Sequence, residues 1–234
     1  MVKAQDLFVE GESKKLLKGD QEDQLVMEFL DTVPTDAKKK LTVRGKKLIN
    51  TKISGYFFEY LLSYNVPTHY IKKIDDKSLL VKKLQMIPVE LIIWNIATNG
   101  LSKRLGLVDG TTLESPVLEF YLKNEKLKNP LINEYHAYAL GLCDRNDMSA
   151  ILRIATKTNA VLRSFFQRKN LILVNFKLEF GKLGGQIILG DEITPDTFTV
   201  WGQIEENKID KKGFVIIPEN AKEVYSKIEA ILLQ

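Results

Sequence analysis

The chain has 234 residues, of which 44% are hydrophobic and 27% charged, a length and composition typical of one large globular domain or two small ones. No apolar run approaches the roughly 20 residues that a membrane-spanning helix needs, so we expect no membrane association. The net charge is only +4, and the 34 basic residues are scattered among 30 acidic ones, which argues against a nucleic-acid-binding groove. Cys143 is the single cysteine, which excludes an internal disulfide; together with an N-terminus that lacks a secretory pattern, it predicts a cytoplasmic protein.

The first third of the chain predicts a small sheet with one helix. Short apolar or alternating runs, separated by glycine and Asp-Asp turns, indicate strands at 7–9, 15–17, 24–30, 70–74 and 78–85. Apolar residues recur at three- and four-residue spacing over 44–64, which indicates a helix, and the composition of 31–40 is that of a loop. We therefore expect residues 1–85 to form an N-terminal lobe.

The rest of the chain has strands in runs, with helices between the runs. The expected strands cover 89–94, 115–122, 171–180 and 186–189, and the expected helices 133–142, 148–169 and 219–234. Strands grouped in this way, without strict strand–helix alternation, favour an α+β fold. We expect residues 86–234 to form a second, larger domain, and no dinucleotide-binding or P-loop motif is present in the sequence.

The most informative candidate binding residues lie on two neighbouring predicted strands. In an extended strand Asn175, Lys177 and Glu179 share one face, and the next strand ends at Asp191. Magnesium binds one or two carboxylates together with phosphate oxygens, and a lysine adds charge for the same phosphates. The pattern therefore indicates a Mg²⁺–phosphate site, with a structural ion pair on an exposed sheet face as the alternative.

The hairpin between these strands tests the metal hypothesis. If Gly184 and Gly185 alone form the loop, Glu179 faces Gly190 and Asp191 points to the other side of the sheet. A loop one residue longer places the two carboxylates opposite each other. A shared metal ion therefore predicts an odd-length loop or a bulge, and carboxylates on opposite faces would exclude it.

Other candidate residues have weaker patterns. Glu90 interrupts an apolar strand, either as a buried carboxylate with a partner or as a strand-edge residue, and Lys14 follows a glycine turn that either covers phosphates or is simply exposed. His69 and His136 lack metal-ligand spacing, and we interpret both as ordinary residues.

Several segments together resemble one enzyme family. They are LVKKLQMIPVELII, SKRLG, LKNEKLKNPLINEYHA, LILVNFKLEFG, LGDEITPDTFTVW and KIDKKGF, in that order, over about 11–214. Their order and spacing resemble those of the phosphoribosylaminoimidazole-succinocarboxamide synthases, or SAICAR synthetases. The resemblance implies a ligase of purine biosynthesis that joins the carboxylate of carboxyaminoimidazole ribotide to the amine of aspartate, with ATP and Mg²⁺. It also implies a SAICAR synthetase-like α+β fold with an ATP cleft between the two domains, small-molecule substrates and a homo-oligomer.

The same resemblance implies roles for individual residues. It places Lys14, Lys82, Met86, Glu90 and Lys177 at the nucleotide, and makes Glu179 and Asp191 the metal ligands. Lys177, Glu179 and Asp191 together form the implied catalytic group. On the acceptor-substrate side it places Asp36, Trp94, Asn99, Gly100, Asp196, Thr199 and Lys211.

The chain departs from the family pattern on the acceptor side. Trp94 and Thr199 stand where the family has arginines, and Asn99-Gly100 replaces a Gly-Ser pair. Each lost charge-assisted contact is worth about 1.5–3 kcal/mol. We therefore expect an ATP-dependent ligase with an altered acceptor pocket.

Two alternatives remain open at this point. One is the standard enzyme with its anion contacts moved to the lysines of 38–40, or to Lys103, Arg104 or Lys211. The other is a non-catalytic nucleotide-binding relative, against which the retained Lys177, Glu179 and Asp191 argue.

Overall fold

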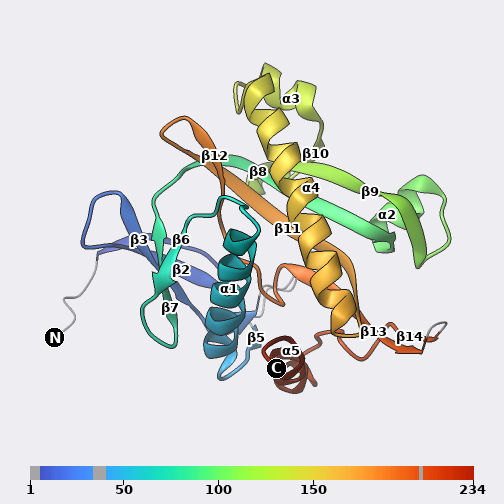
Figure 1. The fold of residues 1–234 in the computed structure, drawn as a ribbon. Coiled ribbons are helices and arrows are strands. Elements are labelled where there is room, and N and C mark those ends of the chain that lie inside the picture. Colours follow the sequence, from blue (N-terminus) through green and yellow to red (C-terminus); the bar gives the residue numbers. More distant parts are fainter. Residues whose placement is uncertain (1–5, 34–40, 206–207) are drawn as a thin grey trace.

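The computed structural model describes residues 6–33, 41–205 and 208–234, and its strands form two large antiparallel sheets and one small one (Figure 1). The five-stranded sheet has the order β1 (Leu7–Glu10), β2 (Lys14–Lys18), β3 (Gln24–Phe29), β7 (Ser78–Lys82) and β6 (Tyr70–Lys73). The seven-stranded sheet has the order β10 (Leu131–Ile132), β9 (Thr111–Leu122), β8 (Gln85–Ala97), β11 (Leu171–Leu183), β13 (Phe198–Glu205) and β14 (Lys208–Asp210), and β12 (Gln186–Leu189) pairs with β11. The small sheet consists of β4 (Thr32–Val33) and β5 (Leu41–Thr42).

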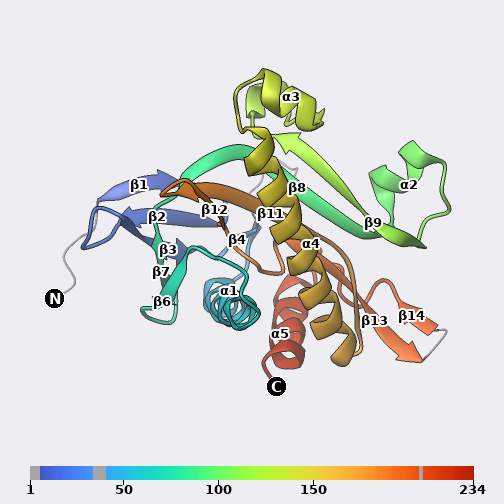
Figure 2. The ribbon, with the colours of Figure 1, turned by 45° about the horizontal axis from the view of Figure 1, so that its top comes forward.

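Helix α1 (Lys46–Ser63) packs on the five-stranded sheet and helix α4 (Arg145–Arg168) on the seven-stranded sheet. The other helices are α2 (Asn99–Leu105), the short 3₁₀ helix η1 (Glu125–Leu127), α3 (Glu134–Ala139) and α5 (Ala221–Leu232). Helix α1 packs on β3, β6 and β7, and α5 lies beside α1. Helix α4 crosses the seven-stranded sheet over β11, as both ribbon views show (Figures 1 and 2), and it also contacts β12. No helix in the described ranges is long and apolar enough to cross a membrane.

The sequence of α4 explains both its start and its buried face. Asp144 and Asp147 form a capping box, in which each carboxylate accepts a hydrogen bond from the other residue's backbone N–H. Met148, Ile151 and Ala155 follow at helical spacing and are buried against the sheet.

The two faces of the seven-stranded sheet differ in polarity. Leu91 on β8 and Phe176 and Leu178 on β11 belong to the buried face under α4. The alternate residues point the other way because neighbouring side chains of a strand lie on opposite sides. We call this second side the open face, defined by Glu90, Trp94, Asn175, Lys177, Glu179 and Thr199.

The chain passes from one large sheet to the other between β7 and β8, near the expected boundary at residue 85. One cluster of buried apolar side chains nevertheless extends from Phe29 in the first sheet to Phe176 in the second. The change of sheet matches the expected boundary, and the division into two domains stays a prediction.

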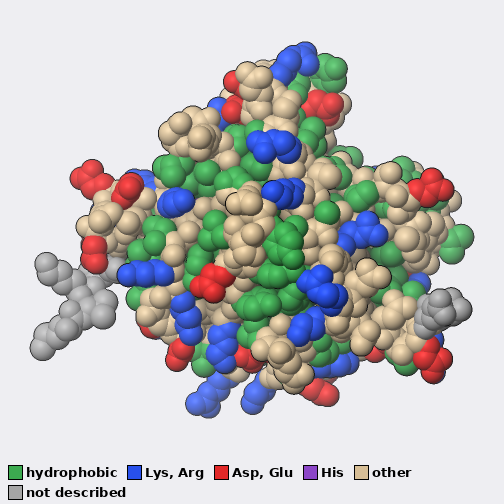
Figure 3. All heavy atoms as spheres, viewed as in Figure 1, with side chains coloured by type: hydrophobic (Ala, Val, Ile, Leu, Met, Phe, Trp, Pro, Cys, Tyr) green, Lys and Arg blue, Asp and Glu red, His purple; other side chains and the backbone are tan. Residues whose placement is uncertain are grey.

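The α+β class is confirmed, and so are the expected strands and helices, with changes at their ends. Strand β8 starts before the expected 89, because Pro88 lies at a register shift in the β8–β11 pairing, where its missing N–H is tolerated. Helix α2 and strands β4, β5, β10, β13 and β14 were not expected, and β4 lies within the segment 31–40 that was expected to be a loop. Lys and Arg side chains are scattered over the face drawn in Figure 3, with apolar and neutral surface between them.

Candidate active site

A cavity of about 430 Å³ lies between the five-stranded sheet and the β8–β11 part of the larger sheet. Five of the residues selected from the sequence line it, from both sheets and from the loop after β12: Lys14, Lys82, Met86, Glu179 and Asp191. The fold therefore brings both metal candidates together with three of the five nucleotide candidates, from places as far apart in the sequence as Lys14 and Asp191.

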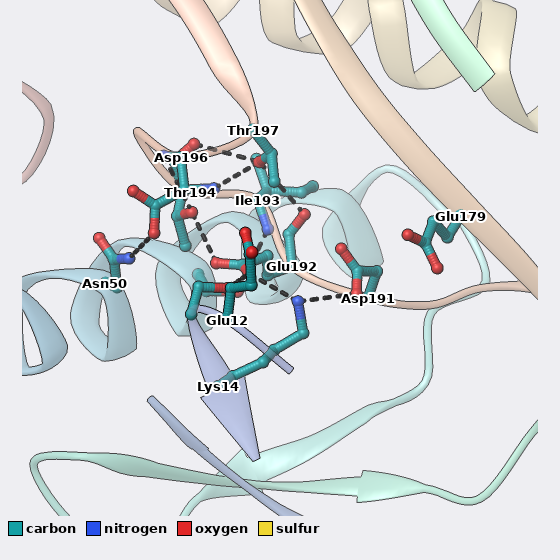
Figure 4. Close-up of polar contacts among 12 residues, drawn as sticks. Glu12, Lys14, Asn50, Glu179, Asp191, Glu192, Ile193, Thr194, Asp196 and Thr197 are labelled. Carbon is teal, nitrogen blue, oxygen red and sulfur yellow. Dashed lines mark hydrogen bonds and ion pairs between the residues drawn. The ribbon is translucent and has the colours of Figure 1, made fainter. Parts of the chain in front are cut away.

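The two predicted metal ligands face the same space. Figure 4 shows the carboxylates of Glu179 and Asp191 pointing toward each other. The hairpin loop has only two residues, since Leu183 pairs with Gln186 and the Gly190 N–H donates to the Glu179 carbonyl at 2.9 Å. Of the two expected options, an odd-length loop or a bulge, the odd-length loop is therefore wrong, and the four β11–β12 pairs contain no register shift.

The backbone conformation of Asp191 directs its carboxylate toward Glu179. Asp191 has a φ of 59°, in the left-handed region that few non-glycine residues adopt. Strand β12 ends at Leu189, so this residue is free of the pleat that would send its side chain to the far side. A turn of the backbone at Asp191 replaces the extra loop residue.

Each of these carboxylates has a lysine partner from another element. Lys14 of β2 lies 2.8 Å from Asp191 and 2.6 Å from Glu192, and Lys123, directly after β9, lies 2.5 Å from Glu179. Lys123 is a site residue that the sequence reasoning missed. Its signal was present, because it is the second residue of the LKNEKLKNP segment and directly follows the strand predicted at 115–122.

Burial and charge act in opposite directions on these groups. Burial and the charge of Asp191 raise the pKa of Glu179 to about 7, against the effect of Lys123. Burial alone would raise the pKa of Asp191, but the Lys14 ammonium outweighs it and the pKa is lowered. Burial would lower the pKa of Lys14, and the two carboxylates beside it raise that pKa instead.

Glu192 fixes Lys14 within the site. Its buried carboxylate accepts hydrogen bonds from the Ser13 and Thr194 hydroxyls at 2.9 and 2.7 Å, besides the contact from Lys14. The β1–β2 hairpin is thereby tied to the loop after β12. The sequence pattern singled out Asp191 of the pair and gave Glu192 no separate role.

The segment entering β8 packs closely on the hairpin strands. A Cβ atom at Gly181 would lie 2.7 Å from the Leu84 side chain and 3.0 Å from the Gln85 carbonyl, so only glycine permits this approach. Apolar side chains also line the cavity: Leu16, Leu25, Val81, Met86 and Ile87. They suit a flat apolar ring, and the charged groups around Asp191 suit an anion with a cation.

His69, interpreted from the sequence as an ordinary residue, also lines the cavity. Burial lowers the pKa of its imidazole to about 4, against the charge of Asp191, so the ring is neutral at pH 7. Its Nε2 is buried and has no hydrogen-bond partner among the described residues.

Glu90 and Lys177 lie outside the cavity, on the open face next to it. Their charged atoms are 3.3 Å apart, and the Lys177 side chain is half-exposed. The sequence left two options for Glu90, a carboxylate with a partner or a strand-edge residue. The contact with Lys177 supports the first.

Trp94 lies on the same face, and its Nε1 donates a 3.0 Å hydrogen bond to Glu119. That buried carboxylate also accepts from Arg104 of α2 and, at 2.9 Å, from the Tyr121 hydroxyl. Arg104 is thus paired with a carboxylate. Thr199 is exposed on β13, where it pairs with Asn175.

The remaining acceptor-side residues are apart from the cavity. Asn99 and Gly100 start α2, and the Asn99 backbone N–H donates to Asp109 at 3.2 Å. Lys211 lies over the Trp201 ring, with 4.8 Å from its Nζ to the ring centroid. Asp36 and the lysines of 38–40 lie outside the described residues.

Asp196 is a buried carboxylate with several polar partners in this structure. Its side chain is only 2% exposed and contacts Lys46 at 2.5 Å, Asn50 at 2.8 Å and the Tyr225 hydroxyl. It joins α1 and α5 to the loop before β13. Asp196 does not line the cavity, and its expected role toward the acceptor stays a prediction.

The donor set in the cavity fits magnesium better than a metal that needs an all-protein cage. No group of three or more His, Cys, Asp or Glu arranged to hold a metal ion occurs in the described part of the chain. Magnesium commonly uses one or two carboxylates and completes its six ligands with phosphate oxygens and water. Two facing carboxylates, each beside a lysine, match that pattern.

Known proteins resemble this chain over nearly its whole length. The family model described as SAICAR synthetase matches residues 7–231. The phosphoribosylaminoimidazole-succinocarboxamide synthase of Persephonella marina is 41% identical over 97% of this chain and 96% of its own length. The crystal structure of that enzyme from Ehrlichia chaffeensis is 32% identical, covers 97% of this chain and 98% of its own, and has a TM-score of 0.88. A SAICAR synthetase solved in complex with ADP is 37% identical over 97% of both chains, also with a TM-score of 0.88.

Proposed function

Since the chain belongs to the SAICAR synthetase family, we propose that it joins the carboxylate of carboxyaminoimidazole ribotide to the amine of aspartate at the expense of ATP. It is an ATP-dependent ligase of purine biosynthesis. The observation that carries the proposal is the convergence of Glu179 and Asp191 in one cavity, each beside a lysine.

ATP binds in this cavity with its base against the apolar side chains. The flat ring packs on Met86 and on the apolar side chains of β2, β3 and β7, and its phosphates extend toward Lys14 and Asp191. The ADP bound by a relative of 37% identity supports the nucleotide assignment.

Glu179 and Asp191 hold Mg²⁺ in this proposal. When bound, the ion would neutralise phosphate charge and stabilise the charge that develops as the phosphorus–oxygen bond breaks. Phosphate oxygens also attract Lys14 and Lys123, which leaves both carboxylates available as ligands.

The reaction takes two steps on the substrates. A carboxylate oxygen of the acceptor attacks the γ-phosphorus of ATP, which forms an acyl phosphate and releases ADP. The aspartate amine then attacks the acyl carbon, loses a proton and displaces inorganic phosphate, leaving an amide. Lys14, Lys123 and Lys177 stabilise the negative charge on the transferred phosphate, since they lie at or beside the cavity.

A second candidate differs only in the acceptor. Trp94 and Thr199 bring no cation to the open face, and Arg104 is already paired with Glu119. An acceptor without a phosphate, whose flat ring stacks on Trp94, suits this surface better than a ribotide does.

A comparison of two substrates separates these candidates. ADP release is measured with ATP, Mg²⁺ and aspartate, and with either carboxyaminoimidazole ribotide or its dephosphorylated riboside. The family reaction predicts a much higher kcat/KM for the ribotide. Equal values would favour the altered acceptor pocket, and no turnover with either compound would contradict both.

A further inference from the structure

Phe8 of strand β1 presents an aromatic side chain to the cavity between the two large sheets. We propose that Phe8 is a base-binding residue, whose ring stacks on the base of the bound nucleotide and covers it from the edge of the five-stranded sheet. The proposal rests on the proposed function, in which ATP occupies this cavity. It adds β1 to the strands that contact the base.

A β-bulge turns Phe8 toward the cavity. The register of β1 against β2 shifts between Leu7 and Val9, which leaves Phe8 as an extra residue without a partner on β2. In a regular strand neighbouring side chains alternate, so Phe8 and Val9 would point to opposite faces of the sheet. Both of them nevertheless line the cavity, whereas Leu7 does not. The bulge therefore brings a second apolar side chain of β1 to the cavity.

The phenyl ring is accessible to a ligand and is held by a neighbouring cation. Phe8 is 47% exposed, so a base that covers it would remove apolar surface from water. The Lys83 ammonium lies over one face of the ring, 5.2 Å from the ring centroid, and the other face is left for a flat group. The backbone N–H of Lys83 donates to the Asp23 carbonyl at 2.7 Å, so the cation extends from a fixed segment between β7 and β8.

The β1–β2 hairpin would then contact both parts of the nucleotide. Lys14 of β2 lies beside Asp191 at the charged groups, and Phe8 of β1 lies among the apolar ones. The remaining apolar lining comes from other strands, with Leu25 on β3 and Met86 on β8. A base has two flat faces, and an aromatic side chain from β1 gives it a stacking partner that the aliphatic lining does not supply.

The test compares the dissociation constants of ADP, with Mg²⁺ present, in variants of β1. Phe8→Ala should raise the Kd about 5- to 150-fold, the usual effect of losing an aromatic partner from a base. Phe8→Tyr keeps the ring and should stay within about twofold of the unaltered protein. Leu7→Ala is the matched control, because Leu7 is an equally exposed apolar residue of β1, at 54%, that does not line the cavity. It should leave the Kd unchanged.

The contact with Lys83 has a test of its own. Lys83→Met should raise the Kd for ADP about two- to fivefold when Phe8 is present and should have no effect in the Phe8→Ala protein, since the cation acts through the ring. Equal effects in both proteins would overturn the supporting role of Lys83.

The outcomes separate this proposal from the proposed function. If the unaltered protein does not bind ADP, the nucleotide site itself is wrong and the role of Phe8 falls with it. If the protein binds ADP and Phe8→Ala binds it equally well, only the role of Phe8 is overturned. An equal loss of affinity in Leu7→Ala and Phe8→Ala also overturns it, since a general disturbance of β1 would give that result.

One measurement needs no variant and so does not depend on folding of the mutants. Nuclear Overhauser effects in the unaltered protein with bound ADP report which side chains lie against the base. Effects between the base protons and the Phe8 ring support the proposal. Effects to the Met86 methyl group without any to Phe8 overturn it, and effects to neither would contradict the placement of the base in this cavity.

Discussion

An arginine at position 94 is expected to strengthen the binding of a phosphorylated acceptor. Trp94 is half-buried, and its Nε1 donates one 3.0 Å hydrogen bond to Glu119. Arginine has five donors, so it can keep a contact with Glu119 and still bind a phosphate with two hydrogen bonds. Such a charge-assisted contact contributes about 1.5–3 kcal/mol, which lowers the KM for the ribotide by roughly 10- to 150-fold.

The assay follows ADP release at saturating ATP and aspartate while the acceptor concentration is varied. Trp94→Arg should lower the KM for carboxyaminoimidazole ribotide and leave that for the riboside almost unchanged. Trp94→Phe is the matched control, because it keeps an aromatic ring, brings no cation and should improve neither substrate. An unchanged ribotide KM in Trp94→Arg would refute the reasoning that the open face lacks an anion contact at this position.

Further predictions concern Lys14, the buried contact of Tyr225 with Asp196, and the ion pair of Asp147 with Lys182. Lys14→Met should weaken ATP binding by roughly tenfold or more, measured by titration calorimetry, because it removes a charge-assisted phosphate contact; unchanged affinity would exclude Lys14 from the phosphate site. Tyr225→Phe removes a buried hydroxyl from the Asp196 carboxylate and should lower the free energy of unfolding by about 1.5–3 kcal/mol in urea denaturation, with the more exposed Tyr56→Phe as control. Burial would raise the pKa of Asp147, but the Lys182 ammonium and the Asp144 backbone N–H lower it. The ionised Asp147 therefore stabilises the fold at neutral pH, and this stabilisation is lost as pH falls below the ordinary carboxyl range. Asp147→Asn should therefore lose less stability than the unaltered protein between pH 7 and pH 3, and parallel losses would contradict this assignment.

Much of the fold was predictable because apolar periodicity is a local property. The spacing of Met148, Ile151 and Ala155 places α4, and the change of pattern near residue 85 falls where the chain changes sheets. Helix α2 was missed because its seven residues are too few to show a clear period. The early start of β8 was missed because Pro88 normally argues against a strand interior and is accommodated here by a register shift.

Five of the residues selected from the sequence line one cavity, whereas the geometry of that cavity was only partly predictable. The strand pattern placed Glu179 correctly, whereas the turn at Asp191 depends on a left-handed backbone that no spacing rule reveals. Lys123 and Glu192 reach the site through tertiary contacts with residues that are distant in sequence. The motif gave no sign that Asp196 is buried and paired with Lys46, and its role toward the acceptor stays a prediction.

The measurement that tests the central claim most directly is ADP release by the purified protein with ATP, Mg²⁺, aspartate and carboxyaminoimidazole ribotide, in parallel with Asp191→Asn. The account predicts ADP formation that requires both aspartate and the ribotide, together with an amide product, and loss of this activity in Asp191→Asn. ADP release that is independent of the two substrates, or full activity in Asp191→Asn, would contradict it.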